Sequence, residues 1–448
     1  MKKALIIIIF CIFITVIVTS CHVSGSPAMH RTVVSETLVT QIDSPSLGSP
    51  LIYSPDARRV AYIADRDGKK SLVVDGVFGK KYDSIKINFR TFSPDSKRVA
   101  YVAVIYGEKP PVGNRWFVVI DGEEGESYNS ATFVTFSPDN KHVAYVADGC
   151  VFLDRVQVKG PEGMPVSGPI FSPDSQSLVY VVERNSKQSV VADGVPGKQY
   201  DRIGTIAFSP SSKNLAYRAK AGKNCYMVID GREEKRYEAG PSVFNPIVFS
   251  PDSKRLAYVA GGIYESLDHR EYREFVVLDG KELTRHKNIS GDLVFSPDSS
   301  HLAYNADAFI FLDDVKKGVC NGGFIGFMFS PDSTRLAYGD IKTGWWGQTT
   351  AAWAVVDGVK CKEYDGVRDV TFSPDSKYVA YIAGQGKKQF VVVDEQKGKE
   401  YDTFGRDFGV SVSTLGLKRI VWDSIDCFHY LVQKGNGIYL VEEIISGQ

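Results

Sequence analysis

Residues 92–103 read FSPDSKRVAYVA, and close copies recur as FSPDNKHVAYVA (136–147), FSPDSKRLAYVA (249–260) and FSPDSKYVAYIA (372–383). Each copy ends one apolar run with Phe-Ser, continues through Pro-Asp or its equivalent, and passes into an alternating run of β-branched and aromatic residues. Pro followed by Asp is typical of a β-turn, and the alternation is typical of a strand on a pleated surface. The stretch therefore predicts two antiparallel strands joined by a tight turn.

The Ser-Pro pair of this stretch recurs between strand-like runs at intervals of about 40 residues, the period expected of four short strands. Its nine serines are Ser54, Ser93, Ser137, Ser172, Ser209, Ser250, Ser296, Ser330 and Ser373. A tenth, degraded copy covers residues 412–422. The chain is therefore expected to be built from one repeated unit.

A second signature lies between the third and fourth strands of each expected unit. Asp75-Gly76 follows the apolar run Leu72-Val73-Val74, and five further Asp-Gly pairs follow similar runs. Asp-Gly between two strands is a strong hairpin signal, because both turn positions need a positive φ. Each unit is therefore predicted to be a four-stranded antiparallel meander.

Meanders of this kind bury both faces when they stand face against face, and their twist bends the row into a ring. The quoted stretch resembles the WD40-like β-propeller repeat of TolB-like periplasmic proteins and of prolyl-oligopeptidase-type enzymes, over about residues 37–448. The resemblance implies an all-β propeller of about ten four-stranded units. We expect one closed ring, in which residues 37–42 pair with residues 437–443, and two smaller propellers are the alternative.

The chain departs from the family pattern at one position of the turn. Where the family commonly has Gly after Pro-Asp, this chain has Ala, Asn or Ser, at Ala57, Ser96, Asn140, Ser175, Ser212, Ser253, Ser299, Ser333 and Ser376. We therefore expect an ordinary type I turn that has no need of glycine. Lys97 and Arg98, which follow the turn, are expected to face solvent.

The N-terminus has the order of a secretory signal, because Lys2 and Lys3 precede an uncharged apolar run over residues 4–18. The run leads to Thr19, Ser20 and Cys21, which resembles a bacterial lipobox. We expect residues 1–20 to be a lipoprotein signal peptide, Cys21 to be lipidated, residues 21–36 to be a flexible tether and residues 37–448 to be the propeller. A non-lipidated cleaved signal and an uncleaved anchor are the alternatives. The expected location is the outer membrane, facing the periplasm or the cell surface.

Composition and cysteine usage limit the classes of partner. Lys plus Arg and Asp plus Glu both number 53, so the chain has no net charge to attract nucleic acid. Five cysteines remain in the mature chain, scattered over different units, and are expected to be small core residues. A disulfide between Cys320 and Cys361 is the alternative. No metal or cofactor is expected, since no histidine has ligand spacing.

No nucleophile elbow, phosphate loop or dinucleotide fingerprint occurs, and the repeated Ser and Asp would be spread around the ring. We therefore expect a non-catalytic scaffold that binds an envelope protein or polysaccharide. The candidate surface lies on the long connections between second and third strands in three units: Tyr106, Arg115, Tyr264, Tyr272, Trp345 and Trp346. The two tryptophans could instead pack on a neighbouring unit. The alternative function is a propeller enzyme, a lyase or hydrolase acting on sugars at the channel mouth.

Overall fold

The computed structural model describes residues 29–43, 50–107, 113–238, 246–265, 270–290, 293–320, 323–344, 349–402 and 419–447. Within these ranges the regular secondary structure is entirely β-strand. None of these residues belongs to a helix of the length and apolarity that a membrane crossing requires. Cys21, Trp345 and Trp346 lie outside the described residues.

The strands form nine antiparallel sheets, eight of one unit each and a ninth that joins two units. Units 1 to 5 contain β2 (Ile52–Tyr53), β3 (Val60–Arg66), β4 (Lys69–Val74), β5 (Val77–Tyr82); β6 (Ser84–Lys86), β7 (Ala100–Ile105), β8 (Arg115–Ile120), β9 (Glu123–Tyr128); β10 (Ala131–Phe136), β11 (Val143–Ala147), β12 (Cys150–Leu153), β13 (Val156–Gln157); β14 (Met164–Pro165), β15 (Ile170–Phe171), β16 (Leu178–Arg184), β17 (Lys187–Ala192), β18 (Val195–Pro196); and β19 (Arg202–Phe208), β20 (Leu215–Ala221), β21 (Asn224–Ile229), β22 (Arg232–Glu238).

Units 6 to 10 follow the same order, and the first strand of the chain joins the last unit. They contain β23 (Ile247–Phe249), β24 (Leu256–Glu265), β25 (Arg270–Leu278), β26 (Lys281–His286); β27 (Val294–Phe295), β28 (Leu302–Ala306), β29 (Phe309–Leu312), β30 (Val315–Val319); β31 (Gly323–Phe329), β32 (Leu336–Thr343), β33 (Thr349–Val356), β34 (Val359–Lys360); β35 (Gly366–Phe372), β36 (Val379–Gln385), β37 (Lys388–Val393), β38 (Gln396–Lys397), β39 (Tyr401–Asp402); and β40 (Ile420–Trp422), β41 (Cys427–Lys434), β42 (Gly437–Gly447) with β1 (Met29–Gln41).

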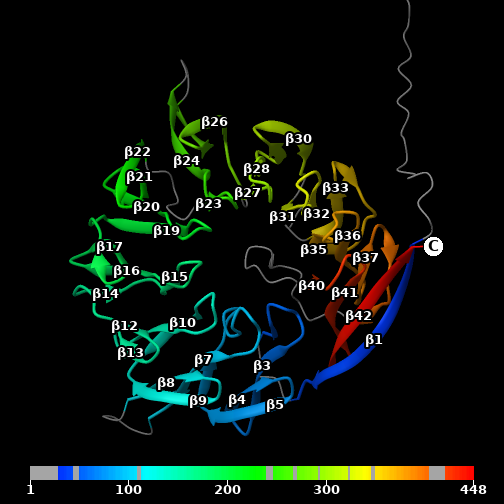
Figure 1. Cartoon of the computed structure of the whole chain (residues 1–448), viewed down its shortest axis with the longest axis horizontal. Coiled ribbons are helices and arrows are strands. Elements are labelled where there is room, and N and C mark those ends of the chain that lie inside the picture. Colours follow the sequence, from blue (N-terminus) through cyan, green and yellow to red (C-terminus); the bar gives the residue numbers. More distant parts are fainter. Residues whose placement is uncertain are drawn as a thin grey trace, which may run out of the picture.

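The ten units follow one another around a central hole, which is the architecture of a β-propeller (Figure 1). Among the strands that Figure 1 labels, the first strands β10, β23, β27, β31 and β35 lie nearer the hole than the fourth strands β13, β22, β26 and β30. The expected all-β fold of about ten four-stranded units is confirmed. We call the wall formed by the first strands the inner wall. We call the face that carries the Ser-Pro-Asp and Asp-Gly turns the turn face, and the opposite face the hairpin face.

The N-terminal strand β1 completes unit 10 from the other end of the chain. It pairs antiparallel with β42, with Thr37 opposite Leu440 and Gln41 opposite Gly437, as the sequence predicted. β1 starts at Met29, however, so residues 29–36, which we expected to be tether, belong to the sheet. Arg31 within this segment is 7% exposed and its Nη2 lies 2.7 Å from Glu443 Oε2.

Unit 10 also contacts unit 1 directly. The Arg58 guanidinium bonds to Asp423 and Glu442 at 3.0 Å each, and Val60 packs against Leu431 and Ile438. Such contacts support the closed ring, which stays a prediction here.

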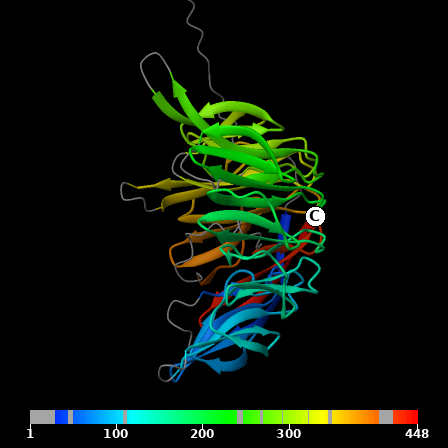
Figure 2. The same ribbon diagram turned by 90° about the vertical axis from the view of Figure 1, so that its left-hand side faces the viewer.

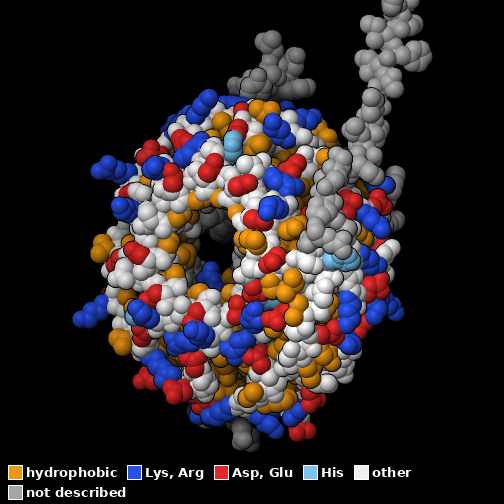
Figure 3. All heavy atoms as spheres, turned by 45° about the vertical axis from the view of Figure 1, so that its right-hand side comes forward, with side chains coloured by type: hydrophobic (Ala, Val, Ile, Leu, Met, Phe, Trp, Pro, Cys, Tyr) orange, Lys and Arg blue, Asp and Glu red, His pale blue; other side chains and the backbone are white. Residues whose placement is uncertain are grey.

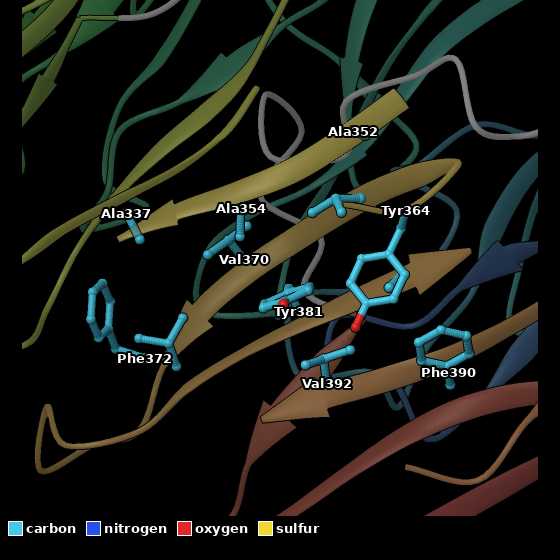
Figure 4. Close-up of a cluster of buried hydrophobic side chains, with 12 residues drawn as sticks. Ala337, Ala352, Ala354, Tyr364, Val370, Phe372, Tyr381, Phe390 and Val392 are labelled. Carbon is cyan, nitrogen blue, oxygen red and sulfur yellow. The ribbon is translucent and has the colours of Figure 1, made fainter. Parts of the chain in front are cut away.

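Neighbouring units hold together through apolar layers between their sheets. Figure 4 shows the layer between units 8 and 9, where Tyr364 of the outer chain segment of unit 8 meets Tyr381 and Phe390 of unit 9 at ring distances of 6.4 and 5.4 Å. The same edge-on tyrosine pair joins Tyr82 to Tyr101 and Tyr200 to Tyr217. Because each unit covers its neighbour in this way, the alternating second strand is buried on both sides.

None of the five cysteines of the described chain forms a disulfide; Cys225 and Cys320 are buried, and Cys150, Cys361 and Cys427 are half-buried. The Cys320–Cys361 bridge that the sequence left open is therefore not formed. Cys320 Sγ instead donates to the Gly323 carbonyl oxygen at 3.0 Å.

Candidate functional site

The repeated Ser-Pro-Asp turn is a structural device. In unit 2, Ser93 Oγ donates to Asp95 Oδ1 at 2.6 Å and accepts from the Arg98 N–H at 2.9 Å, while the Ser96 N–H donates to the Ser93 carbonyl oxygen at 2.8 Å. These bonds stabilise the turn internally, and they engage the Ser93 hydroxyl both as a donor and as an acceptor. The same pattern recurs around the ring, so the serines do not meet at one centre.

The residue after Pro-Asp has a left-handed backbone, which the sequence did not predict. φ is 52° at Ala57, 66° at Asn140 and between 62° and 67° at the seven serines. The Ala57 N–H donates to the Ser54 carbonyl oxygen at 2.9 Å, as in a β-turn, and the turn forms without glycine as expected. The left-handed backbone that follows Pro-Asp nevertheless favours glycine in general. Ser96 illustrates the compensation: its Oγ accepts from the Asp56 N–H of the preceding unit at 3.1 Å.

Seven further links of this kind join successive turns at the turn face. Their donor and acceptor residues are Asp95 and Asn140, Asp139 and Ser175, Asp174 and Ser212, Ser211 and Ser253, Asp252 and Ser299, Asp298 and Ser333, and Asp332 and Ser376. A glycine would relieve the backbone strain but has no side chain to accept the bond. The Ser or Asn therefore stabilises the contact between units.

Arg98 reinforces the same contact. We expected this residue to face solvent, but its guanidinium is bound to protein groups. Its Nε donates to Asp121 at 2.8 Å, its Nη1 donates to the Asn140 carbonyl oxygen of unit 3 at 2.9 Å, and its guanidinium lies 5.3 Å from the Phe136 ring centroid. Arg59, Arg255 and Arg335 make equivalent bonds in their units.

His142 and His301 occupy the arginine position in units 3 and 7. Each is bonded through Nδ1, at 2.6 Å, to the aspartate in the turn between the third and fourth strands of its unit, which is Asp154 or Asp313. Across the described ranges, no group of three or more His, Cys, Asp or Glu is placed to hold a metal ion.

The four predicted binding-surface residues within the described ranges lie on the hairpin face but do not form one site. Tyr106 is 54% exposed and Arg115 is exposed, both in unit 2. Tyr264 and Tyr272 lie on the hairpin of unit 6, on the other side of the ring (Figure 1). The structure therefore spreads these residues around the rim.

Tyr272 has a packing role within its own hairpin. A Cβ built on Gly261 would lie 1.7 Å from its hydroxyl oxygen, so the ring covers a place that only glycine leaves open. Burial, with a smaller contribution from Glu274, raises the pKa of Tyr272 to about 12. Tyr272 is half-buried, which makes it a weaker binding candidate than Tyr106.

Two regions of the inner wall differ from the repeat, and the sequence did not single out either of them. The first is a cleft of about 380 Å³ along units 6, 7 and 8, lined mainly by apolar side chains that include Val248, Val294, Phe295 and Met328. Apolar side chains gather along the edge of the hole in Figure 3.

The second region is a charged cluster, the Arg419 cluster, formed by Arg368 and Asp369 of unit 9, Arg419 beside β40, and Tyr53 of unit 1. Asp369 Oδ2 lies 3.8 Å from Arg368 Nε and 3.9 Å from Arg419 Nε, and the Arg419 guanidinium lies 5.2 Å from the Tyr53 ring centroid. The charged side chains are 8–15% exposed. Burial raises the pKa of Asp369, and the two guanidiniums oppose this shift.

A bulge in β35 places Asp369. The register with β36 shifts between Arg368 and Thr371, and Asp369 within this shift has a φ of 54°. The corresponding bulges carry Phe133 in unit 3 and Gly326 in unit 8. Asp is among the residues that tolerate this conformation, so the bulge accepts a carboxylate here. Alternation in the sequence gives no sign of such a bulge.

No protein-family model matches the chain, and no curated protein matches it. Among solved structures, it is similar to a eukaryotic initiation factor (15% identity, 73% of this chain and 89% of that chain, TM-score 0.47). It is also similar to the Dos1 propeller (12%, 69% and 93%, TM-score 0.37) and to TolB from Acinetobacter baumannii (15%, 59% and 75%, TM-score 0.27). At such identities the likeness concerns the fold alone.

Proposed function

We propose that this chain is an exported envelope lipoprotein, anchored through Cys21, whose propeller binds a protein partner at the hairpin face without catalysing a reaction. The observation that carries the proposal is the enlargement of particular hairpins on one face. β24 and β25 have 10 and 9 residues and β32 and β33 have 8 each, whereas β11 and β12 have 5 and 4.

The enlarged hairpins extend on the same side of the ring. In Figure 2 the green hairpin of unit 6 and the gold hairpin of unit 8 reach past the other units on the left of the view. Loops and hairpins that project from a rigid scaffold are common sites of recognition. Two such projections at separate places around the rim suit a large partner that touches both at once.

The exposed side chains of this face favour protein over polysaccharide. Tyr106 is aromatic, Arg115 is cationic and Ile263, which is 40% exposed, is aliphatic. Tyr and Arg are enriched at protein interfaces, and an exposed Ile offers apolar area that a sugar uses poorly. An envelope polysaccharide remains the second ligand class to test.

The enzyme alternative requires several carboxylates and a His or Tyr to converge near the hole. The Arg419 cluster brings one carboxylate together with two arginines and one tyrosine. This composition supports binding of a charged group better than acid–base chemistry, which uses groups that exchange protons.

Cross-linking and affinity purification from native envelopes tests the binding proposal. We expect the wild-type chain to capture a specific protein, and the double variant Tyr106→Ala/Arg115→Ala to lose it without a lower melting temperature. Trp345→Ala/Trp346→Ala tests the residues of unit 8 in the same way. The matched control is Lys97→Ala/Lys141→Ala on the turn face. Equal capture by wild type and all hairpin-face variants would refute the proposal.

Membrane fractionation tests the anchor separately. Cys21→Ala should move the chain from the membrane to the soluble fraction, because no acyl chain can then be attached. Membrane association that does not change would contradict the lipoprotein assignment and leave the binding proposal standing.

A further inference from the structure

Strand β1 has one edge that the described part of the chain leaves without a partner strand. β1 pairs with β42 and stands last in the strand order of its sheet. It lies at the outer rim of the ring (Figure 1). At about 3.3 Å per residue, its 13 residues span about 43 Å. The side of β1 away from β42 therefore presents a long row of backbone N–H and C=O groups.

The outermost strands of the other units are protected against pairing with a second chain. β13, β18, β34 and β38 have two residues each, and Pro196 lies in β18. Longer outer strands carry exposed charges, among them Lys80 and Lys81 of β5 and Lys316 and Lys317 of β30. Short length, proline and lysine are devices that keep strand edges from pairing.

β1 has none of these devices. Residues 29–41 contain no Pro and no Lys, and the side chains of Arg31 and Glu36 are only 7% and 16% exposed. Two bulges interrupt the pairing with β42, at Val34 and Val39, and the register is regular on either side of each. The exposed residues include no Lys, Arg, Asp or Glu: they are His30, Thr32, Val33, Val34, Thr37, Leu38 and Gln41. β1 is thus a long edge rich in the Thr and Val residues that favour strands.

Contacts to the rest of the propeller hold β1 in place. Arg31 Nη1 donates to the Val391 and Gln396 carbonyl oxygens of unit 9 at 3.0 and 2.7 Å. Glu36 accepts from Lys399 at 2.5 Å and from Lys434 at 2.9 Å. The strand is therefore fixed before a second strand arrives, which lowers the entropy cost of pairing.

A second copy of this chain fits the edge better than a charged partner does. Charge complementarity selects foreign partners, and like charges opposite each other on paired strands are destabilising. The exposed residues of β1 offer no Lys, Arg, Asp or Glu to match a foreign charge, and none to repel a second β1. A contact between identical patches must be self-complementary, and antiparallel pairing about a two-fold axis meets this condition.

We propose that the outer edge of β1 pairs antiparallel with β1 of a second copy, so that two propellers form a dimer through one continuous sheet. The pairing adds backbone hydrogen bonds and places Val34 and Leu38, which are 56% and 45% exposed, beside side chains of the second strand. The edge is separate from the hairpin face, so the dimer and the proposed binding function can fail independently.

Light scattering with ultraviolet and refractive-index detection tests the dimer, because it measures the protein mass of the purified full chain. We expect the mass to rise from that of one chain to that of two as the concentration increases. Thr32→Lys/Thr37→Lys puts like charges on both paired strands and should weaken dimerisation by at least about tenfold. The matched control Ser127→Lys/Val156→Lys adds the same charge at exposed positions of β9 and β13 and should leave dimerisation unchanged.

A mixture of charge variants tests whether the two β1 strands touch. Thr32→Lys/Thr37→Lys and Thr32→Glu/Thr37→Glu should each be weakened alone and should form a mixed dimer together, because opposite charges then meet across the pair. A wild-type chain that stays monomeric at every concentration would overturn the proposal, whether or not a variant folds or another protein binds the edge. A dimer of equal strength in wild type, the lysine variant and the control would overturn it too, because the contact would then lie elsewhere.

Discussion

The interfaces among units 1 to 9 differ from the seam formed by units 9, 10 and 1 in the residues that join neighbouring units. Among units 1 to 9, a Ser or Asn side chain accepts from the preceding turn and several arginines cross to the next unit. At the seam, His429 Nε2 bonds the Asp56 carbonyl oxygen at 2.7 Å, and Arg58 bonds Asp423 and Glu442. The regular interfaces repeat one contact between turns, whereas units 10 and 1 use His429 and Arg58 in its place. Units 9 and 10 keep the edge-on tyrosine pair of the other units, with Tyr401 and Tyr430 6.4 Å apart.

The difference teaches where new chemistry can arise in a repeated fold. A motif residue that holds two units together has its hydrogen-bonding capacity occupied, as Ser93 and Arg98 have. Residues outside the motif are free to differ, and the inner wall beside the seam contains the Arg419 cluster. The four predictions that follow test this contrast in order of expected effect.

The largest effect is expected at Arg31, which ties the N-terminal strand to the seam. Arg31→Ala leaves the Glu443 carboxylate, 2% exposed, without its cationic partner. Loss of one member of a buried ion pair costs about 3–5 kcal/mol. Denaturant unfolding should show this loss, while Lys399→Ala, which removes an exposed partner of Glu36, should cost less than about 1 kcal/mol. Equal losses would mean that β1 does not hold the seam.

A smaller loss of stability is expected at a regular interface between units. Arg98→Ala removes the bonds to Asp121 and to the Asn140 carbonyl oxygen and should cost about 1–3 kcal/mol in denaturant unfolding. Lys97→Ala, at the adjacent exposed position, should change stability by less than about 0.5 kcal/mol. If Arg98→Ala matches Lys97→Ala, the arginine does not hold the units together.

The turn aspartates predict an acid-sensitive turn face. The Ser137 hydroxyl and the Lys141 N–H lower the pKa of Asp139 to about 2, below its ordinary value of 3.8. A lowered folded-state pKa gives stability that is present above the ordinary value and is lost as the pH falls from about 4 to about 2. Unfolding measured from pH 7 to pH 2 should show this decline, and Asp139→Asn should make it shallower. An unchanged slope would contradict the assigned role of the carboxylate.

The smallest expected effect is an increase in the free energy of unfolding. Ala57 has the left-handed backbone but no side-chain acceptor, so Ala57→Gly should stabilise the chain by about 0.5–1 kcal/mol. At Ser96 the same change relieves strain but removes the bond from Asp56, and we expect a net effect near zero. Thermal unfolding of both variants separates the two contributions, and a similar gain at both positions would show that the serine bond adds nothing.

The sequence predicted the fold well because the same turn and strand patterns recur in unit after unit. Copies of the Ser-Pro-Asp and Asp-Gly turns were enough to predict four-stranded units, and the two ends of the chain pointed to the pairing of β1 with β42. The left-handed residues were missed because no glycine marks them. The role of Arg98 between units was missed because Asn140 and Phe136, which it contacts, belong to the next unit.

The candidate sites were harder to predict than the fold. Arg368 and Arg419 are far apart in sequence, and the bulge that places Asp369 leaves no pattern in the alternation of β35. The exposed hairpin residues were found because insertions break the repeat visibly. Their dispersal around the rim depends on which units are enlarged, and only the arrangement of the ring shows it (Figure 1).

The most direct test of the central claim compares partner capture by two variants that are equally well folded at the assay temperature. Capture from native envelopes, normalised to folded protein, should persist in Arg98→Ala and be lost in Tyr106→Ala/Arg115→Ala. That result would assign structure to the repeat and binding to the departures from it. Capture that is lost in Arg98→Ala and retained in the hairpin-face variant would contradict the account.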